Sequence, residues 1–576
     1  MSERVLQAIA AAEGIAVGPA FCYAPPHLAI PDRRPGSPDE ELARFQAARE
    51  QARAELADLK AHLEARADSA TAAIFDAHAM MLDDPMLSEA VASRVRNGLI
   101  VEAAVAGAAD ELAALLSGMD NELFAARAAD VRDVCQRVLR ILLGLPEARL
   151  DSLAKPSIIV ARDLTPSDTA RLHPEKTLGF CTAAGGLTSH TSILARTLGI
   201  PAVVGLGETA IADIQNGMLL ALDGSAGTVI VDPDPPTLVQ LELIRQSHLA
   251  QQAQRREAAI QEARTTDGRR VEVGANVGDV ESARDAASFG ADGVGLLRTE
   301  FLYLQDAQPP NEERQIAAYR AIFEAMQGRP VIVRTLDIGG DKPPSYLDFP
   351  NELNPFLGWR AIRLCLDDLP LFKTQLRAIL RAAVGHHALI MYPMISSLDE
   401  LRRANATLEE VRAELAAAGL EYAQDVPVGI MVETPAAAML ADALIQECDF
   451  FSLGTNDLTQ YTLAVDRTNE RVARLFEPLH PAVLRLIQTT IDAAHAQGKW
   501  VGMCGELAGM KRAIPILLGL GLDEFSMAPR AIPDAKWLIS QLSMAQAQEI
   551  AQRALSLSTA TEVEAYMQEL MAEIER

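Results

Sequence analysis

Six polar side chains that could carry out chemistry follow short apolar runs in the second half of the chain. They are two carboxylates, three arginines and one thiol: Glu433, Asp457, Arg298, Arg334, Arg467 and Cys504. Carboxylate oxygens are ligands that Mg2+ prefers, and this ion completes its shell with water and substrate oxygens. Guanidinium groups bind phosphate and carboxylate through paired hydrogen bonds. The set predicts a Mg2+ site for a small phosphorylated carboxylic acid, in which the thiol could donate a proton to carbon.

A second group of residues surrounds one histidine in the first half of the chain. Residues 184–196 read Ala-Gly-Gly-Leu-Thr-Ser-His-Thr-Ser-Ile-Leu-Ala-Arg, and a helix is predicted over residues 191–198 with Thr188 or Ser189 near its N-cap. His190 then stands at a helix N-terminus, where free N–H groups and the helix dipole attract an anion. A phosphorylated imidazole is stabilised there. The side chains that could hold its phosphoryl oxygens are Thr188, Thr191, Ser192 and Arg196.

The elements that must position the first group are short strands alternating with helical segments. Strands of this kind form parallel βα units, and eight of them predict a (β/α)8 barrel, with an open doubly wound sheet as the alternative. In a barrel, the residues after each strand meet at one face. The eight predicted strands are Val271–Val277, Gly293–Leu297, Val331–Leu336, Leu389–Met394, Val428–Val432, Phe450–Leu453, Val501–Cys504 and Glu524–Met527.

The first half of the chain divides into three further regions. Residues 33–145 contain few prolines and repeat apolar side chains at a helical period, which predicts a bundle of about four helices. Residues 1–32 and 146–232 carry short strand-like runs and are expected to form one small α/β domain, into which the bundle is inserted. Residues 233–263 are expected to form a linker, with a helix from Leu238 to Ala263. Residues 264–576 form the barrel.

Composition excludes several classes of protein. The chain has 576 residues, with 52 Lys and Arg against 78 Asp and Glu, a net charge of −26. This charge disfavours nucleic acid and anionic membrane surfaces as partners. Apolar runs are too short for membrane insertion, the N-terminus does not resemble a signal peptide, and the six cysteines form no CxxC pair. We therefore expect a cytoplasmic enzyme with reduced thiols.

The motifs that carry both groups resemble those of one family. They occupy residues 185–192, 293–301, 334–342, 354–360, 432–435, 454–461 and 502–506. In these segments the sequence resembles phosphoenolpyruvate–protein phosphotransferase, the enzyme I of the bacterial sugar phosphotransferase system, and the resemblance runs nearly end to end. The family most often has Arg at Leu187 and Met at Leu336. Neither position holds a catalytic group, but Leu187 lies beside the histidine.

The resemblance implies a role for each site residue. His190 looks like the phosphoacceptor, modified on Nε2, and Cys504 like the proton donor that converts the enolate to pyruvate. Glu433 and Asp457 match the Mg2+ ligands of the family. The remaining substrate contacts are Arg298 and Arg334 for the phosphate, Arg467, Asn456 and Asp457 for the carboxylate, and Arg360 and Lys342 as further candidates.

The resemblance also implies partners and a domain movement. The family passes the phosphoryl group to a histidine of the carrier HPr, which docks on the inserted bundle, and it forms a homodimer through the barrel. The residues that match the docking surface are Phe75, His78, Met80 and Met81. The α/β domain is expected to swing about the linker helix. A regulatory, nitrogen-type enzyme I is the alternative, whereas dikinases need an ATP-binding region for which the bundle leaves no room, and a lyase on such a barrel would not need His190.

Overall fold

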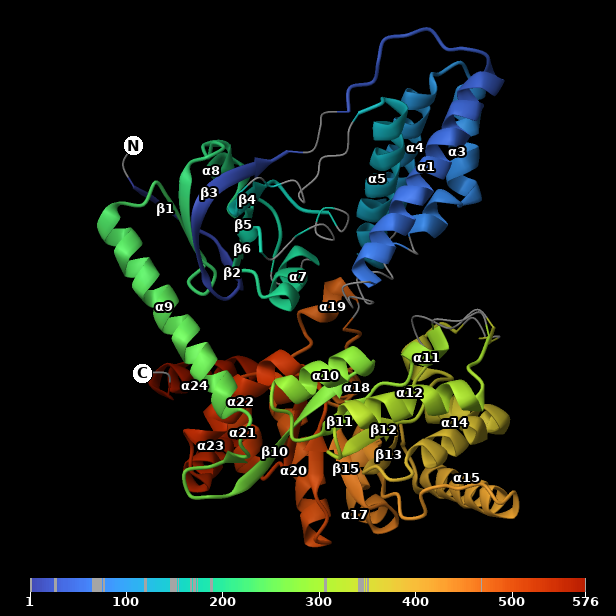
Figure 1. The fold of residues 1–576 in the computed structure, drawn as a ribbon, viewed down its shortest axis with the longest axis vertical. Coiled ribbons are helices and arrows are strands. Elements are labelled where there is room, and N and C mark those ends of the chain that lie inside the picture. Colours follow the sequence, from blue (N-terminus) through green and yellow to red (C-terminus); the bar gives the residue numbers. More distant parts are fainter. Residues whose placement is uncertain are drawn as a thin grey trace. The chain divides into compact units, whose positions relative to one another are not determined.

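The computed structural model describes residues 3–24, 28–64, 75, 78–118, 122–145, 153, 155–165, 168, 172, 175–186, 190–304, 308–339, 346–347, 349, 352–467 and 469–574. The chain forms two compact units, residues 1–251 and 252–576. Their helices and strands are labelled in Figure 1.

Eight parallel strands of the second unit close into a barrel. In the ring, each strand pairs with the next in sequence, and β10 pairs with both β11 and β17. The short strand β9 (Ala263–Arg264) adds to β10 in the antiparallel direction. Closure confirms the predicted (β/α)8 barrel and excludes the open sheet. The strands are β10 (Arg270–Val277), β11 (Val294–Leu297), β12 (Val331–Arg334), β13 (Ala388–Tyr392), β14 (Val428–Val432), β15 (Phe450–Leu453), β16 (Val501–Met503) and β17 (Glu524–Met527).

Three of these strands end before their predicted limits. The predicted ends at Leu336, Met394 and Cys504 give way to ends at Arg334, Tyr392 and Met503. The reason is clearest after β13, where Met394 adopts a positive φ of 57° that regular strand pairing does not allow. The polar residues that follow these strands therefore stand in loops.

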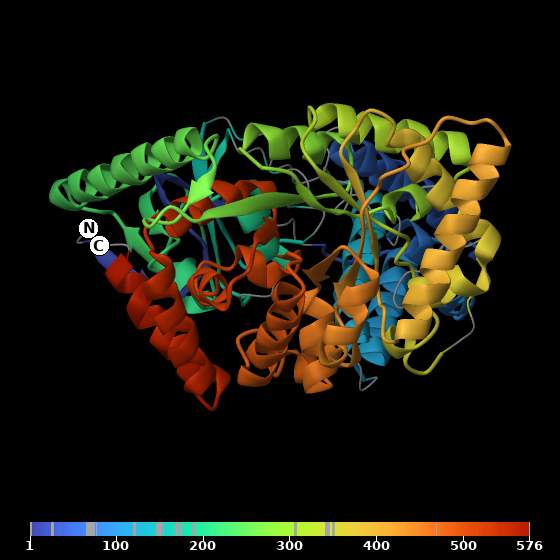
Figure 2. The ribbon, with the colours of Figure 1, turned by 90° about the horizontal axis from the view of Figure 1, so that it is seen from below.

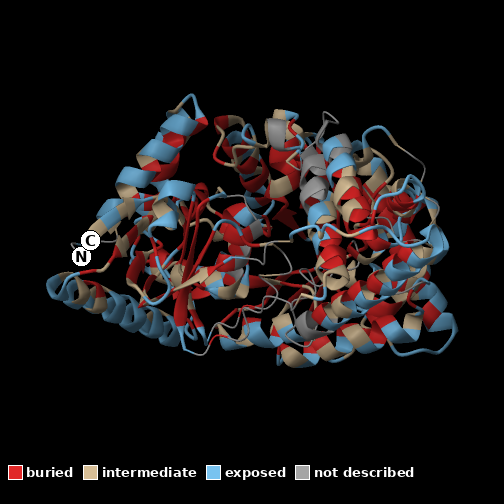
Figure 3. Cartoon of the chain, turned by 90° about the horizontal axis from the view of Figure 1, so that it is seen from above, coloured by how far each residue is buried: buried red, intermediate tan, exposed pale blue. Residues whose placement is uncertain are grey.

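Helices cover the outside of the barrel, and Figure 2 shows this unit from below. Most of the helices of this unit bury one face against the strands, and the strands themselves are almost wholly buried (Figure 3). The helices are α10 (Val280–Ser288), α11 (Phe301–Leu304), α12 (Glu312–Ala325), α13 (Ile362–Asp367), α14 (Leu369–Ala382), α15 (Leu398–Ala417), α16 (Pro435–Met439), α17 (Ala441–Leu444), α18 (Thr455–Leu463), α19 (Glu470–Ala473), α20 (Pro481–Ala496), α21 (Ile514–Leu520), α22 (Ile532–Ser540), α23 (Met544–Ser556) and α24 (Ala560–Ile574). The 3-10 turns are η2 (Pro355–Leu357), η3 (Ile445–Glu447), η4 (Glu506–Gly509) and η5 (Pro529–Ala531).

The first unit contains an eight-stranded mixed sheet whose order is β1-β8-β7-β3-β4-β5-β6-β2. Strands from the start of the chain pair with strands that follow the bundle. For example, β3 pairs with β4 in parallel and with β7 in the antiparallel direction. The bundle is thus an insertion in chain order. The strands are β1 (Arg4–Gln7), β2 (Ile9–Ala12), β3 (Ile15–Tyr23), β4 (Ser157–Ala161), β5 (Thr177–Thr182), β6 (Ala202–Val204), β7 (Leu219–Asp223) and β8 (Thr228–Val231), with helices α7 (His190–Leu198) and α8 (Glu208–Ala212) between them.

The inserted bundle is formed by helices that pack around one apolar core. Asp84 caps α3, its side chain accepting the Met86 amide at 2.7 Å, and Pro85 occupies the first helical position. The helices are α1 (Pro38–Glu64), α3 (Pro85–Arg96), α4 (Val101–Gly118) and α5 (Glu122–Leu142), and residues 75 and 78–82 are also helical.

Helix α9 (Pro235–Ala258) is the expected linker, although it ends five residues before the predicted limit at Ala263. Beyond its end, Ala259 is buried against the barrel unit and Ala263 starts β9, so the chain has already turned into the sheet. Near the start of α9, Leu241 packs with Ile15 of β3. Residues 245–254 in between are exposed (Figure 3).

The described part of the chain contains no candidate membrane-spanning helix. Among those residues, no helix combines the length and the apolar character needed to cross a bilayer. All six cysteines are free thiols.

Candidate active site

The ring of polar side chains gathers at one end of the barrel. Arg298 follows β11, Arg334 ends β12 and Glu433 follows β14. Asp457 lies in the first turn of α18, directly after β15, and Cys504 follows β16. Because the strands are parallel and closed into a ring, all five positions stand at the C-terminal face.

Arg334 is held between two carboxylates that the sequence analysis left without a role. Its Nη2 donates to Glu300 Oε1 at 2.9 Å, and its Nη1 lies 3.0 Å from Asp337 Oδ2. Burial opposes the guanidinium charge, but Glu300 and Asp337 outweigh it and raise the pKa of Arg334. Glu300 and Asp337 each lie just beyond a strand end, which is the signal that could have identified them.

Arg360 joins the same network through Asp337. Arg360 Nη2 donates to Asp337 Oδ1 at 2.9 Å and to Oδ2 at 3.1 Å, and Nη1 donates to the Tyr461 hydroxyl at 3.2 Å. Burial raises the pKa of Asp337, but Arg334 and Arg360 overcome this and lower it. Asp337 therefore stays charged and orients both arginines. Tyr461 lies within α18, where its sequence position gave no sign of a role.

The two carboxylates predicted to bind metal lie close enough to repel each other. Glu433 is 1% exposed, and its pKa is raised by burial and then by repulsion from Asp457 and Asp337. The Asp457 Oδ1 atom is buried without a hydrogen-bond partner, and its nearest cationic groups are Arg360 Nη1 at 3.6 Å and Arg467 Nη2 at 3.8 Å. A buried acceptor of this kind is costly unless a cation or donor satisfies it. The pair therefore fits a hard divalent cation.

Any such cation would keep coordination positions for other ligands. Among the described residues, no three His, Cys, Asp or Glu side chains are placed to share one metal ion. Two carboxylates with water and substrate oxygens form the kind of shell that Mg2+ adopts.

Cys504 is a buried thiol facing the barrel interior. It is 5% exposed, and the Ser452 hydroxyl donates to its Sγ at 3.4 Å. Burial raises the pKa of Cys504 to about 11, although Ser452 and Arg334 oppose the shift. The thiol thus carries its proton at neutral pH and can act as an acid rather than as a nucleophile.

Arg298 and Arg467 leave donors for a ligand. Arg298 is exposed at the end of β11. The Arg467 Nη1 atom is buried without a hydrogen-bond partner, while its backbone amide donates to Gln460 Oε1 at 3.2 Å. Asn456 binds Glu506 in both directions: Nδ2 donates to Oε1 at 3.3 Å, and the Glu506 amide donates to Oδ1 at 3.1 Å. Lys342 lies outside the described residues.

A cavity of about 600 Å3 opens beside this ring. Its lining includes Met394, whose amide donates to Glu433, and Gln460, which accepts the Arg467 amide. Tyr461, the partner of Arg360, also lines it. The ring therefore borders a space into which a small ligand fits.

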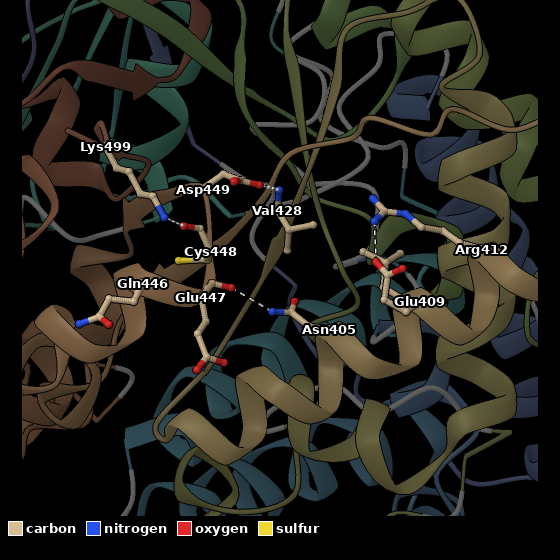
Figure 4. A pocket seen from close by; sticks show the side chains of 10 residues that line it. Asn405, Glu409, Arg412, Val428, Gln446, Glu447, Cys448, Asp449 and Lys499 are labelled. Carbon is tan, nitrogen blue, oxygen red and sulfur yellow. Dashed lines mark hydrogen bonds and ion pairs between the residues drawn. The ribbon is translucent and has the colours of Figure 1, made fainter. Parts of the chain in front are cut away.

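A second cavity, of about 320 Å3, lies at the opposite end of the barrel (Figure 4). Its polar groups already bind one another: Lys499 Nζ donates to the Cys448 carbonyl at 2.6 Å, and Asp449 accepts the Val428 amide at 2.7 Å. Arg412 donates to Glu409 at 2.6 Å. These contacts join residues at the strand starts, and they are typical of structural support rather than of a ligand site.

The second group of residues lies in the first unit. Helix α7 begins at His190, one residue before the predicted start at Thr191, and the Ser192 hydroxyl donates to the Gly186 carbonyl at 2.7 Å. Thr191 Oγ1 donates to the Leu164 carbonyl at 3.3 Å. Arg196 Nη1 donates to the Ala11 carbonyl on β2 at 3.1 Å. Thr188, Ser189 and Leu187 lie outside the described residues.

The predicted docking residues divide between surface and core. Met80 is 69% exposed, and Met81 is partly buried against the bundle core. Phe75 and His78 are fully buried, and the His78 ring lies 3.3 Å from an Asp130 carboxylate oxygen. Their prediction as surface contacts is corrected, because their side chains point into the bundle.

Comparisons with known proteins cover nearly the whole chain. Three family models match: the PEP-binding domain of PEP-utilising enzymes over residues 252–544, their N-terminal domain over 7–127 and their mobile domain over 153–227. A phosphoenolpyruvate-protein phosphotransferase of Bacillus sp. (strain S) is 47% identical over 98% of both chains. Proteins of that name from Staphylococcus carnosus and Listeria monocytogenes are 44% and 43% identical, over 97% and 99% of both chains. The chain belongs to the phosphoenolpyruvate-protein phosphotransferase family.

Proposed function

We propose that this chain transfers the phosphoryl group of phosphoenolpyruvate to its own His190 and then to a histidine of the carrier HPr, releasing pyruvate. The observation that carries the proposal is the C-terminal ring of the barrel. There, arginines for two anionic groups, a pair of buried carboxylates and a protonated thiol share one site. The relatives compared above bear the name of this activity, so the nitrogen-regulatory alternative is the less supported.

The arginines divide the substrate between them. Arg298 and Arg334 bind the phosphate, and Arg467 with the Asn456–Asp457 backbone binds the carboxylate. The buried Arg467 Nη1 without a partner supports the second assignment. Arg360 and Lys342 are further candidates for substrate contacts, and Asp337 keeps Arg360 in place.

Glu433 and Asp457 would hold Mg2+. An ion held there would supply positive charge to offset the negative charge on the transferring group. The Asp457 Oδ1 atom, buried without a hydrogen-bond partner, and the raised pKa of Glu433 support the assignment, because a cation would relieve both. Removal of divalent metal should abolish activity, and its return should restore it.

The chemistry requires one phosphoryl and one proton transfer. The bond from phosphorus to the enol oxygen breaks as the bond from phosphorus to His190 Nε2 forms, with the charge spread over the equatorial oxygens held by the arginines. The enolate becomes pyruvate when C3 takes the Cys504 proton. The thiolate then regains a proton from solvent. The start of α7 favours the phosphorylated imidazole, with Thr188 and Arg196 as its expected supports.

The inserted bundle would receive the carrier. Between Glu64 and Asp130 the chain has twelve acidic and four basic residues, which predicts attraction to a basic face of HPr. Met80 is the exposed apolar side chain that could contact HPr, and Met81 is partly exposed.

A homodimer through the barrel is supported by exposed apolar side chains near the cavity of about 600 Å3. Leu353 and Leu357 line this cavity and are exposed, and Met439 and Leu440 lie at the end of α16, whose first residues line it too. Exposed apolar surface of this kind is typical of an interface. Sedimentation of the purified chain would test the dimer.

The function is tested by measuring pyruvate from phosphoenolpyruvate and Mg2+, with and without HPr. We expect a single burst of pyruvate without HPr, stoichiometric with the chain, and repeated turnover with excess HPr until all of the HPr is phosphorylated. ATP should not replace phosphoenolpyruvate. Continuous turnover without a carrier, or phosphorylation from ATP, would contradict the proposal.

A further inference from the structure

A buried hydrogen-bond circuit connects the ends of β11 and β12 beneath the arginine ring. Thr299 Oγ1 donates to the Arg334 carbonyl at 3.0 Å. Gln375 Nε2 on α14 donates to Thr299 Oγ1 at 3.1 Å, and Gln375 Oε1 accepts the Leu336 amide at 2.9 Å. Thr299 and Gln375 are fully buried. The circuit therefore binds the end of β12 at two backbone groups, the Arg334 carbonyl and the Leu336 amide, which flank Thr335.

The circuit stands where backbone pairing stops. The ladder between β11 and β12 reaches Leu297 opposite Val333 and is already irregular there. Beyond that pair, side chains connect the two segments. Thr299 lies between Arg298 and Glu300 in sequence, so its position sets theirs.

The effect passes directly to the Arg334 guanidinium. Glu300 Oε1 accepts both from Arg334 Nη2 at 2.9 Å and from the Asp337 amide at 3.2 Å. A shift of Thr299 would therefore move Arg298, move the carboxylate of Glu300, and with it the side chain of Arg334.

Gln375 is itself fixed by a second layer of buried contacts. Its Nε2 also donates to the Tyr319 hydroxyl at 3.3 Å, and Tyr319 donates to Gln315 Oε1 at 3.2 Å. The side-chain amide of Gln315 donates through Nε2 to the Pro310 carbonyl at 2.9 Å. Because these groups are buried, Gln375 cannot rotate without leaving one of them unpaired. The circuit has one favoured arrangement.

We propose that Thr299 and Gln375 are positioning residues that hold Arg298 and Arg334 at the spacing that a phosphate requires. The inference rests on the proposed function, since it assumes that these two arginines bind the phosphoryl group. Catalysis by positioning is sensitive to displacements of this scale, and an error of about 1 Å can cost about 100-fold in rate.

The test compares threonine variants in the full-length chain. Thr299→Val keeps the shape and removes the hydroxyl, and Thr299→Ser restores the hydroxyl. Thr490→Val is the matched control, because Thr490 is equally buried but donates to the Leu486 carbonyl within its own helix, α20. For each protein we would measure Tm, phosphoenolpyruvate affinity by calorimetry, and the rate of His190 phosphorylation against phosphoenolpyruvate concentration.

We expect Thr299→Val to lower kcat/KM for phosphoenolpyruvate by about 10- to 100-fold and to weaken its binding. Thr299→Ser and Thr490→Val should stay close to the wild type. Phosphorylation of His190 in reverse, from phosphorylated HPr, should be unchanged in all variants, because it does not use the barrel. Gln375→Met should reproduce Thr299→Val, and the double variant should be little worse than either.

Two results would overturn the inference. Thr299→Val could change only Tm, as Thr490→Val would, or Thr299→Ser could be as impaired as Thr299→Val. A wild-type chain that binds phosphoenolpyruvate without labelling His190 would instead refute the proposed transfer. In that case the calorimetric comparison still decides the positioning role.

Discussion

At the scale of single residues, the environment of Cys504 determines its chemistry. A thiol in an apolar, buried setting resists ionisation, and the pKa of about 11 means that it is protonated over the whole physiological range. Cys448 offers a comparison, because burial raises its pKa to about 12 as well, but it lies at the other end of the barrel. The two thiols differ in position rather than in acidity.

We predict that Cys504→Ala slows pyruvate formation by about 100- to 10,000-fold, the range that a general acid supplies. Cys448→Ala should leave the rate unchanged. A coupled lactate dehydrogenase assay measures both variants. Unchanged pyruvate formation in Cys504→Ala, or equal loss in Cys448→Ala, would count against the role of Cys504 as proton donor.

Glu524 on β17 is a second unusual residue, and its carboxyl occupies space that glycines on β11 and β16 leave inside the barrel. A Cβ atom at Gly295 would lie 2.5 Å from its Oε1, and one at Gly502 2.4 Å from its Oε2. Burial raises the pKa of Glu524 to about 8, with smaller contributions from Glu272 and Asp292. The carboxyl is therefore mostly uncharged in the folded protein at neutral pH.

This pKa gives stability a defined pH dependence. As pH rises from about 4.5 to about 8, the unfolded chain loses a proton that the folded chain keeps, so the stability contributed by Glu524 falls over this window. We predict that Glu524→Gln raises Tm relative to the wild type more at pH 8 than at pH 5, by on the order of a few degrees. Calorimetry at the two pH values tests this, and an equal difference at both would contradict it.

Sequence alone indicated where the candidate site residues stand better than it indicated their contacts. Five ring members stand at or just after a strand end, so local order predicted that they share one face of the barrel, whereas Arg467 follows α18. The ion pairs of Arg334 with Glu300 and Asp337 depend on how separate loops meet, which spacing does not reveal. The docking role of Phe75 and His78 came from the resemblance to the family alone, and the resemblance does not tell which side chains of the helix pack inward.

At the scale of elements, the start of α18 is fixed by a close approach to the loop after β16. A Cβ atom at Gly505 would lie 1.9 Å from Thr455 Oγ1 and 2.7 Å from the Thr455 backbone nitrogen. A side chain there must displace the first turn of α18, which carries Asn456 and Asp457. Gly278 provides a control, because its Cβ position is open.

We predict that Gly505→Ala raises both the KM for phosphoenolpyruvate and the Mg2+ concentration needed for half-maximal activity, by about tenfold or more. Gly278→Ala should match the wild type. Titration of activity with each ligand measures the effect. If Gly505→Ala titrates like Gly278→Ala, the first turn of α18 is not part of the site.

The elements themselves differ in how far sequence could predict them. In the sequence, polar residues and glycines flank each barrel strand, and all eight strands were predicted. In contrast, β7 was missed, because a five-residue apolar run does not distinguish a strand from a buried helix. Its partner β3 lies about 200 residues away in sequence, beyond the reach of local pattern.

At the scale of the whole molecule, the proposed reaction requires His190 of the first unit to reach the ring of the second. The exposed stretch 245–254 of α9 is where we expect bending, because Leu241 before it and Arg255 after it are packed. Arg255 lies over the Trp537 ring at 3.7 Å and pairs with Asp534 at 2.8 Å.

The net charge of −26 also has a consequence for partners. We predict that transfer from His190 to HPr slows with rising ionic strength, because an acidic bundle attracts a basic face, and that Met80→Ala slows it further. Phosphorylation of His190 from phosphoenolpyruvate should be unchanged in Met80→Ala. Stopped-flow measurement of each half-reaction separates the two steps. A rate of transfer from His190 to HPr that does not change with salt would exclude electrostatic docking of the carrier.

The most direct test of the account is the location of the phosphoryl group. The wild-type chain and His190→Ala are incubated with labelled phosphoenolpyruvate and Mg2+, and the label is mapped by mass spectrometry. We expect an acid-labile phosphate on His190 in the wild type and none in His190→Ala. Label that persists in His190→Ala, or that resides on another residue, would contradict the account.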